Sequence, residues 1–141
     1  MGLDVSHDCW SGAYSAFNRW RDKLCDAAGY AFTTTGSNHR GKELAIDWGH
    51  VESDWMYGDW PFIPCRIDGT PDPLLLLILH SDCEGKIRAE HTGALADRLT
   101  ELLPDLEGDG GGHVGSYRLT TQRFIDGLRD AQSRNEDIEF H

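Results

Sequence analysis

Two short segments hold most of the side chains that could do chemistry. Ser6-His7-Asp8-Cys9 and His80-Ser81-Asp82-Cys83-Glu84 each combine an imidazole, a carboxylate and a thiol. If the two strands before them are parallel neighbours, these groups meet at one edge of a sheet, where ligand sites tend to form. We therefore expect a ligand pocket lined by His7, Asp8, His80, Asp82 and Glu84.

The same segments contain the side chains that zinc prefers. Zn²⁺ binds cysteine sulfur and histidine nitrogen in a tetrahedral shell, and an open fourth position acidifies a bound water. The candidate zinc ligands are His7, Cys9, His80 and Cys83. Their spacing matches no CxxC or HExxH motif, and such residues also serve as helix caps or small core side chains. We therefore expect no cofactor, with zinc as the alternative.

Two further segments suggest contacts with a polar ligand. The polar loop 33–42 carries Arg40, whose guanidinium beside glycine N–H groups could hold a phosphate. A solvated connection is the alternative reading of this loop. Trp48, Trp55 and Trp60 alternate with acidic residues and could stack a nucleobase, although tryptophans also cover the edges of small cores.

Hydrophobic periodicity predicts the elements that must position these groups. We expect a first strand ending at Val5, and then a helix from Asp8 to about Ala28 that Gly29 terminates. The remaining expected elements are strands near Leu44–Trp48, Phe62–Ile67 and Leu74–Leu79, helices over Thr92–Leu103 and Thr120–Ser133, and an edge strand at Ile138–Phe140. This order predicts one α+β domain over 1–141, with a small mixed sheet of four or five strands and three helices packed against it.

Composition and charge exclude several classes of function. Acidic residues outnumber Lys and Arg by 24 to 13, which gives a net charge of −11 and argues against general nucleic-acid binding and against docking on anionic membranes. The longest apolar run, Leu74–Leu79, is far too short to span a membrane. The first residues do not form a signal peptide, so we expect a soluble cytoplasmic protein with reduced thiols. Self-association into a homo-oligomer stays open.

Two segments of the sequence resemble segments of other small proteins. Gly2–Phe17, which begins GLDVSHD, and Leu79–Gly85, which reads LHSDCEG, resemble a group of small, functionally uncharacterised phage and bacterial proteins. The resemblance implies a compact accessory protein in the cytoplasm of a bacterium or an infected host cell. By analogy with phage proteins of this size, it suggests evasion of host defence.

Three functions remain open on these grounds. The first is binding of a small polar molecule, a nucleotide-type host signal that the protein sequesters. The second is a zinc-dependent hydrolase that uses the His7/Asp8/Cys9 and His80/Asp82/Cys83 clusters. The third is an acidic module that blocks a protein or mimics nucleic acid, although the acidic residues never form a long run. The absence of a catalytic motif favours binding over catalysis.

Overall fold

The computed structural model describes residues 2–30, 57, 60–66, 69–81, 83–108 and 115–141. Its elements in chain order are β1 (Gly2–Val5), β2 (Trp10–Ala13), α1 (Tyr14–Ala28), α2 (Leu75–Ile78), β3 (Gly85–Ile87), α3 (Ala89–Leu102), the short 3₁₀ helix η3 (Leu103–Asp105), α4 (Tyr117–Arg134) and β4 (Ile138–Phe140). A small sheet combined with helices confirms the predicted α+β class.

The four strands form one sheet in the order β2-β1-β4-β3. Val5 pairs with Phe140 and Ile87 pairs with Ile138. All the pairings of the described strands are antiparallel, so this sheet is antiparallel where a mixed one was predicted. The strand predicted at Ile138–Phe140 is confirmed, but it lies between β1 and β3 and not at an edge.

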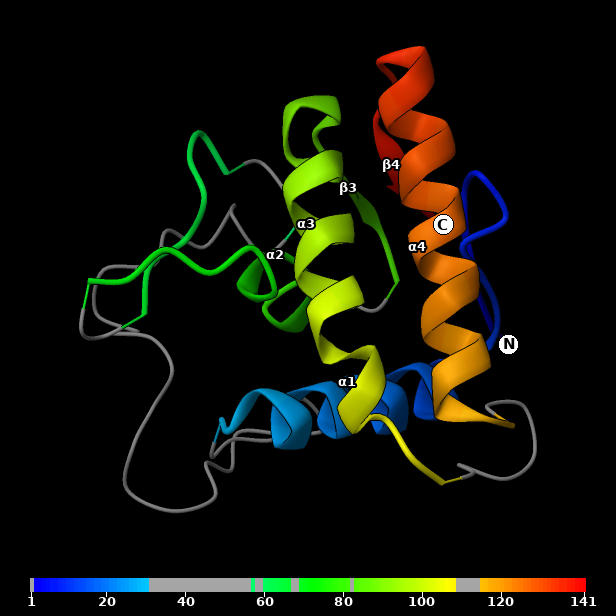
Figure 1. The fold of residues 1–141 in the computed structure, drawn as a ribbon. Helices are drawn as coiled ribbons and strands as arrows, with labels where there is room; N and C mark the ends of the chain where they lie inside the picture. Colours follow the sequence, from blue (N-terminus) through cyan, green and yellow to red (C-terminus); the bar gives the residue numbers. More distant parts are fainter. Residues whose placement is uncertain (1, 31–56, 58–59, 67–68, 82, 109–114) are drawn as a thin grey trace.

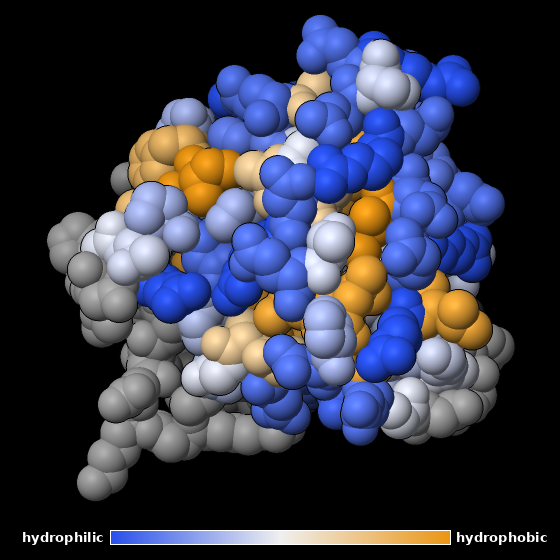
Figure 2. All heavy atoms as spheres, viewed as in Figure 1, coloured by the Kyte–Doolittle hydropathy of each residue, from blue (hydrophilic) through white to orange (hydrophobic). Residues whose placement is uncertain are grey.

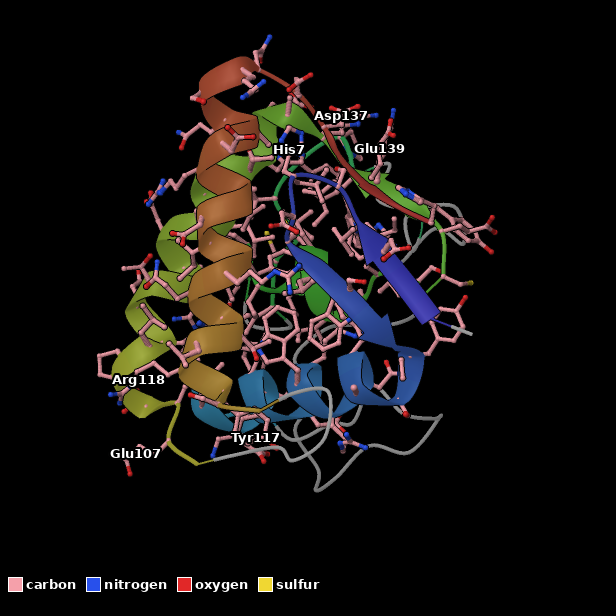
Figure 3. All side chains as sticks on the ribbon, turned by 90° about the vertical axis from the view of Figure 1, so that its right-hand side faces the viewer. His7, Glu107, Tyr117, Arg118, Asp137 and Glu139 are labelled. Atoms are coloured by element: carbon pink, nitrogen blue, oxygen red, sulfur yellow. The ribbon has the colours of Figure 1, made fainter. Side chains whose placement is uncertain are left out.

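Helices cover one face of this sheet. In Figure 1, α3 and α4 lie side by side and α1 crosses their lower ends; turned by 90° in Figure 3, the sheet lies along one side of the helices. The strands alternate accordingly, because successive side chains of a strand point to opposite faces. Leu3, Val5, Ile138 and Phe140 are buried, whereas Asp4 and Glu139 are exposed.

An aromatic cluster joins α1 to the sheet and to α4. The rings of Trp10 and Trp20 are stacked with centroids 5.6 Å apart, and Phe17 lies 5.3 Å from Trp10 in an edge-to-face contact. The ring of Trp20 also lies 5.0 Å from that of Phe124 in α4. The indole N–H of Trp20 donates to Thr121 Oγ1 at 2.9 Å, so this buried polar group is satisfied.

The predicted helix from Asp8 to Ala28 starts six residues later than expected, at Tyr14. Residues 6–9 form a β-turn in which Cys9 N donates to Ser6 O at 3.3 Å. Its central residues, His7 and Asp8, have φ angles of 58° and 61°, as in a type I′ turn that joins two strands. Trp10, which fits the helical stripe, therefore belongs to β2. Gly29 ends α1 with φ 81°, as predicted.

The strand predicted at Leu74–Leu79 is wrong, because this run forms the buried helix α2. Asp72 starts the helix: its Oδ1 accepts a hydrogen bond from Leu74 N at 2.9 Å, and its carbonyl accepts one from Leu75 N at 3.1 Å. The buried Arg21 guanidinium closes the other end by donating to the carbonyls of Leu77 and His80 at 3.1 and 2.5 Å. A cation at a helix C-terminus is favourable.

The other predicted elements are partly confirmed. The helices expected at Thr92–Leu103 and Thr120–Ser133 correspond to α3 and α4, each with an earlier start. Of the strand expected at Phe62–Ile67, residues 62–66 contain only an isolated bridge between Cys65 and Pro71. The strand expected at Leu44–Trp48 lies outside the described residues. Within the described part of the chain, no helix is both long and apolar enough to cross a bilayer.

Candidate functional site

His7 and Asp8 are both held by α4. His7 Nδ1 lies 2.9 Å from Asp130 Oδ2, and its Nε2 lies 3.8 Å from Glu136 Oε1. Arg123 donates to the carbonyl of Asp8 at 2.8 Å and to its carboxylate at 2.9 Å. The Asp8 side chain is largely exposed, whereas that of His7 is mostly covered. The two residues therefore fasten the β1–β2 turn to the surface of α4.

His80 lies inside the core. Its ring stacks on that of Phe140 with centroids 3.9 Å apart. Its Nδ1 lies 2.7 Å from Ser81 O and its Nε2 2.9 Å from Lys86 O. Burial lowers the pKa of His80, and the nearby Arg21 charge lowers it further, against the raising effect of the two carbonyl contacts. Because α2 replaces the expected strand, the parallel strand pair that was to bring His7 and His80 together does not exist.

The four predicted zinc ligands are not brought together. Cys9 is buried and its Sγ donates to Phe124 O at 3.7 Å, and burial raises the pKa of this thiol to about 12. Cys83 is exposed, with its Sγ 3.4 Å from Ser81 Oγ. Among the residues that the structure describes, no group of three or more His, Cys, Asp or Glu side chains could hold a metal ion. A zinc-dependent hydrolase therefore stays a prediction from sequence alone.

The other predicted ligand-binding residues are placed only in part. Arg40, Trp48, Trp55 and Asp82 lie outside the described residues. Glu84 is exposed on the approach to β3. Trp60 is described and buried, with its ring in edge-to-face contact with that of Phe62 at 6.2 Å. The exposed ring of this pair is therefore Phe62, which is 49% exposed.

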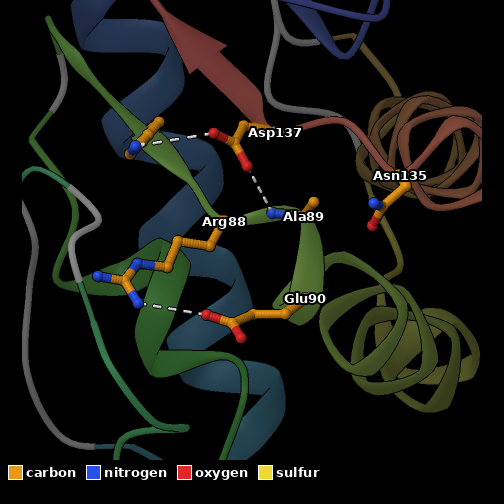
Figure 4. A pocket seen from close by; sticks show the side chains of 6 residues that line it. Arg88, Ala89, Glu90, Asn135 and Asp137 are labelled. Carbon is orange, nitrogen blue, oxygen red and sulfur yellow. Dashed lines mark hydrogen bonds and ion pairs between the residues drawn. The ribbon is translucent and has the colours of Figure 1, made fainter.

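An open polar pocket of about 340 Å³ lies where β3 enters α3 and α4 leads into β4. Figure 4 shows its lining from close by: Lys86, Arg88, Ala89, Glu90, Asn135 and Asp137. Lys86 and Arg88 are two residues apart and flank the buried Ile87, so the extended chain directs both cations away from the core. Asn135 ends α4 with φ 53°, which turns the chain toward β4.

Asp137 connects the two sides of this pocket. Its Oδ1 accepts a hydrogen bond from the backbone N–H of Ala89 at 2.7 Å, and its Oδ2 lies 3.7 Å from Lys86 Nζ. A carboxylate from a distant element thus occupies the first turn of α3, where free N–H groups and the helix dipole favour negative charge. On the β3–α3 side of the pocket, Arg88 pairs with Glu90 at 3.3 Å.

An aromatic segment borders the same turn of α3. His91 Nε2 donates to the carbonyl of Trp60 at 3.0 Å, which fastens the 60–66 segment beside Glu90. Figure 2 shows a hydrophobic patch beside the upper end of α3, where this segment runs in Figure 1. Phe62 lies on this segment and exposes about half of its side chain. The segment that carries Phe62 is therefore attached to the same turn of α3 that follows Lys86 and Arg88.

Sequence reasoning missed this pocket. The sequence analysis singled out neither Lys86 nor Arg88, and the Asn135–Asp137 connection carries no motif. The available signal was the alternation Lys-Ile-Arg, which puts two cations on one side of a short strand in an acidic protein. Nothing in the sequence indicates that residues 86–90 meet residues 135–137.

Sequence reasoning also missed a buried ionic cluster around Asp72, which is 1% exposed. Arg98 Nε donates to Asp72 Oδ1 at 3.0 Å, and Arg66 Nη2 donates to Oδ2 at 3.3 Å. The hydroxyl of Tyr30 donates to the same Oδ2. Because this carboxylate also caps α2, it joins four segments of the chain, and we assign the cluster to the stability of the fold.

Comparison with protein-family models, with curated proteins and with solved structures finds no match to this chain.

Proposed function

We propose that this protein binds and holds a small anionic ligand of the nucleotide type in the pocket between β3–α3 and α4–β4. The observation that carries the proposal is that two cations directly before α3, Lys86 and Arg88, both line this pocket. Together with the dipole of α3, these cations favour an anion there. In the setting that the sequence resemblance implies, such binding would sequester a host signal.

The ion pairs within the pocket are compatible with ligand exchange. Arg88 and Glu90 are 33% and 59% exposed, and Lys86 and Asp137 are 46% and 37% exposed. Ion pairs with this exposure contribute only about 0–1 kcal/mol each, because water screens them and holding two side chains costs entropy. A phosphate, which carries more charge and more acceptor oxygens than a carboxylate, can therefore compete for Lys86 and Arg88.

The neighbouring aromatic segment supports the nucleotide class over simple anions. Phe62 presents an exposed ring on the segment that His91 fastens to α3. Stacking of a base on an aromatic side chain contributes about 1–3 kcal/mol. The proposed ligand therefore has two parts, a phosphate held by Lys86 and Arg88 and a base that contacts the 60–66 segment.

The test is isothermal titration calorimetry with a panel of mononucleotides and cyclic nucleotides. We expect saturable binding by at least one of them, with affinity reduced about tenfold or more in Lys86→Ala and Arg88→Ala. Arg129→Ala is the matched control, because Arg129 is an exposed cation of α4 that pairs with Asp97 outside the pocket lining. No binding by any nucleotide, or equal losses in all three variants, would overturn the proposal.

A second measurement separates holding from turnover. Nucleotide recovered after incubation is examined by mass spectrometry. Unchanged nucleotide supports sequestration. Conversion that wild-type protein catalyses and Arg88→Ala does not would overturn that part of the proposal and identify an enzyme.

A further inference from the structure

The pocket between β3–α3 and α4–β4 is lined by as many carboxylates as cations. The cations are Lys86 and Arg88, and the carboxylates are Glu90 and Asp137. Lys86 Nζ lies 3.7 Å from Asp137 Oδ2. Arg88 Nη1 lies 3.3 Å from Glu90 Oε1, and Figure 4 draws both ion pairs as dashed lines. The lining therefore has no net formal charge, and an anion bound by the cations must lie close to both carboxylates.

The carboxylate of Asp137 is held in place beside the cations. Its Oδ1 accepts a hydrogen bond from the backbone N–H of Ala89 at 2.7 Å, which attaches the side chain to the start of α3. The next residue, Ile138, is buried and pairs with Ile87, the residue between the two cations. The β3–β4 pairing therefore holds the backbone of Asp137 there. A phosphate cannot take the Ala89 N–H without displacing this carboxylate, so the two cations must hold it.

Glu90 contributes a second negative charge that is less firmly held. Its side chain is 59% exposed, pairs with Arg88 and lies 3.9 Å from His91 Nε2, which already contacts the carbonyl of Trp60. Glu90 can rotate to release Arg88, but its place in the first turn of α3 keeps its charge near the pocket. Removing that charge therefore changes the electrostatics of the pocket without changing a backbone contact.

Further carboxylates lie next to the pocket. Glu139 is the cross-strand partner of Lys86, and both are exposed, because side chains of directly opposite residues lie on the same face of a sheet. Glu136, which lies in the sequence between two lining residues, is exposed as well. The cation at the end of α4, Arg134, donates to Asp130 at 3.1 Å. A ligand that extends beyond the two cations of the pocket therefore meets negative charge.

We propose that the pocket takes ligands with a single phosphate group and rejects nucleoside di- and triphosphates, with Asp137 and Glu90 as the residues that determine this specificity. One phosphate suits the two cations, whereas each further phosphate places more negative charge beside carboxylates. Like charges that repel the wrong ligand are a general source of specificity. The volume of about 340 Å³ agrees, since sites for small molecules span roughly 300–1,000 Å³. This inference rests on the proposed function, because it names the class of nucleotide that the same pocket binds.

The first test uses inorganic phosphate, pyrophosphate and tripolyphosphate, which contain no base. Each anion is titrated into the protein at pH 8 and constant ionic strength, and the backbone amide NMR signals of Ala89, Glu90 and Asp137 are followed. In wild-type protein we expect phosphate to bind at least as tightly as tripolyphosphate. A site governed by cations alone gives the opposite order, because attraction grows with the charge of the anion.

Two variants remove the carboxylate charges one at a time. We expect Glu90→Gln and Asp137→Asn each to raise the affinity for tripolyphosphate, relative to that for phosphate, about threefold or more. Glu101→Gln is the matched control, because Glu101 is an exposed glutamate of α3 that pairs with Arg98 about three helical turns, or ~16 Å, from Glu90. At that distance salt screens its charge from the pocket. Glu90→Gln keeps the test decisive if Asp137→Asn does not fold.

Two results of these titrations would overturn the inference. One is tighter binding of tripolyphosphate than of phosphate to wild-type protein. The other is a ratio of the two affinities that Glu90→Gln leaves at the wild-type value.

A second series, with the mono-, di- and triphosphates of adenosine and guanosine, separates the inference from the proposed function. A monophosphate that binds more tightly than the corresponding triphosphate supports both. Binding that strengthens from mono- to triphosphate leaves the proposed function standing and overturns the inference. If no nucleotide binds but the inorganic anions follow the expected order, the proposed function fails and the selection for a single phosphate stands. Absence of binding in both series would overturn the two together.

Discussion

Gly127 of α4 lies so close to Cys9 that a Cβ atom at position 127 would be 2.3 Å from Cys9 Sγ. The same atom would lie 2.8 Å from the backbone oxygen of His7. The β1–β2 turn therefore contacts α4 backbone to backbone, and only glycine permits this approach. The close contact explains why glycine stands in the interior of a helix, where it otherwise costs about 1 kcal/mol relative to alanine.

Gly127→Ala should destabilise the protein by about 1–3 kcal/mol, because overpacking against backbone outweighs the gain in helix propensity. Urea denaturation measures the effect. Gly93→Ala in α3 is the control, because its Cβ would meet only the end of the flexible Gln132 side chain. We expect that variant to be neutral or more stable than wild type. Equal destabilisation by the two substitutions would contradict the backbone contact at Gly127.

Asp72→Asn should destabilise the protein by about 3 kcal/mol, because it removes the buried negative charge to which the partly buried guanidinium groups of Arg98 and Arg66 donate. Asp97→Asn removes an exposed carboxylate that pairs with Arg129 and should cost less than about 1 kcal/mol. Chemical denaturation of both variants gives the comparison. Similar losses in the two would show that the Asp72 cluster contributes no more than a surface pair.

His80 should make the protein less stable in mild acid. Burial holds the folded-state pKa below the ordinary value of 6.5, so below that pH the unfolded chain binds the proton more readily. Stability is therefore full above about pH 6.5 and falls toward lower pH, by at most about 1.4 kcal/mol per pH unit. Urea unfolding between pH 5 and 7.5 measures this slope. His80→Gln should reduce it, and His141→Gln, which removes an exposed imidazole, should not.

The four cysteines should divide into two classes of reactivity. Cys65 and Cys83 are exposed, whereas Cys9 and Cys25 are buried, and the pKa of about 12 keeps Cys9 protonated at neutral and mildly alkaline pH. Labelling with a thiol reagent at pH 8 should therefore modify Cys65 and Cys83 first. The other two should react only after unfolding in concentrated urea. Rapid labelling of Cys9 in the native protein would contradict its buried position.

Sequence reasoning predicted the elements whose apolar residues recur regularly on one face of a helix or strand. The core of α1, α3 and α4 follows from apolar residues at helical spacing, and β4 follows from the alternation in Ile138–Phe140. Leu74–Leu79 could not be assigned in this way, because a continuous apolar run suits a buried strand and a buried helix equally well. Asp72, which caps α2, and the helix-favouring leucines were the signals that pointed to a helix.

The hairpin at the start of the chain was missed for a different reason. A type I′ turn usually has Asn-Gly or a similar pair at its two central positions, whereas this turn has His7 and Asp8 there. Its conformation depends on Asp130, Arg123 and Gly127 in α4, more than 100 residues away in the sequence. Local propensity cannot predict a turn that tertiary contacts hold in place. The pocket was missed for the same reason, because it depends on a contact between Asp137 and Ala89, which are 48 residues apart in the sequence.

The central position of β4 has a consequence for biosynthesis. Residues 138–140 separate β1 from β3, so until β4 has been synthesised β1 lacks its second neighbour in the described sheet and β3 lacks its pairing partner. The β1–β2 hairpin must therefore wait, with the β4-facing edge of β1 unpaired, while residues 14–140 are synthesised. Nascent chains of this protein are therefore expected to depend on chaperones that shield such edges.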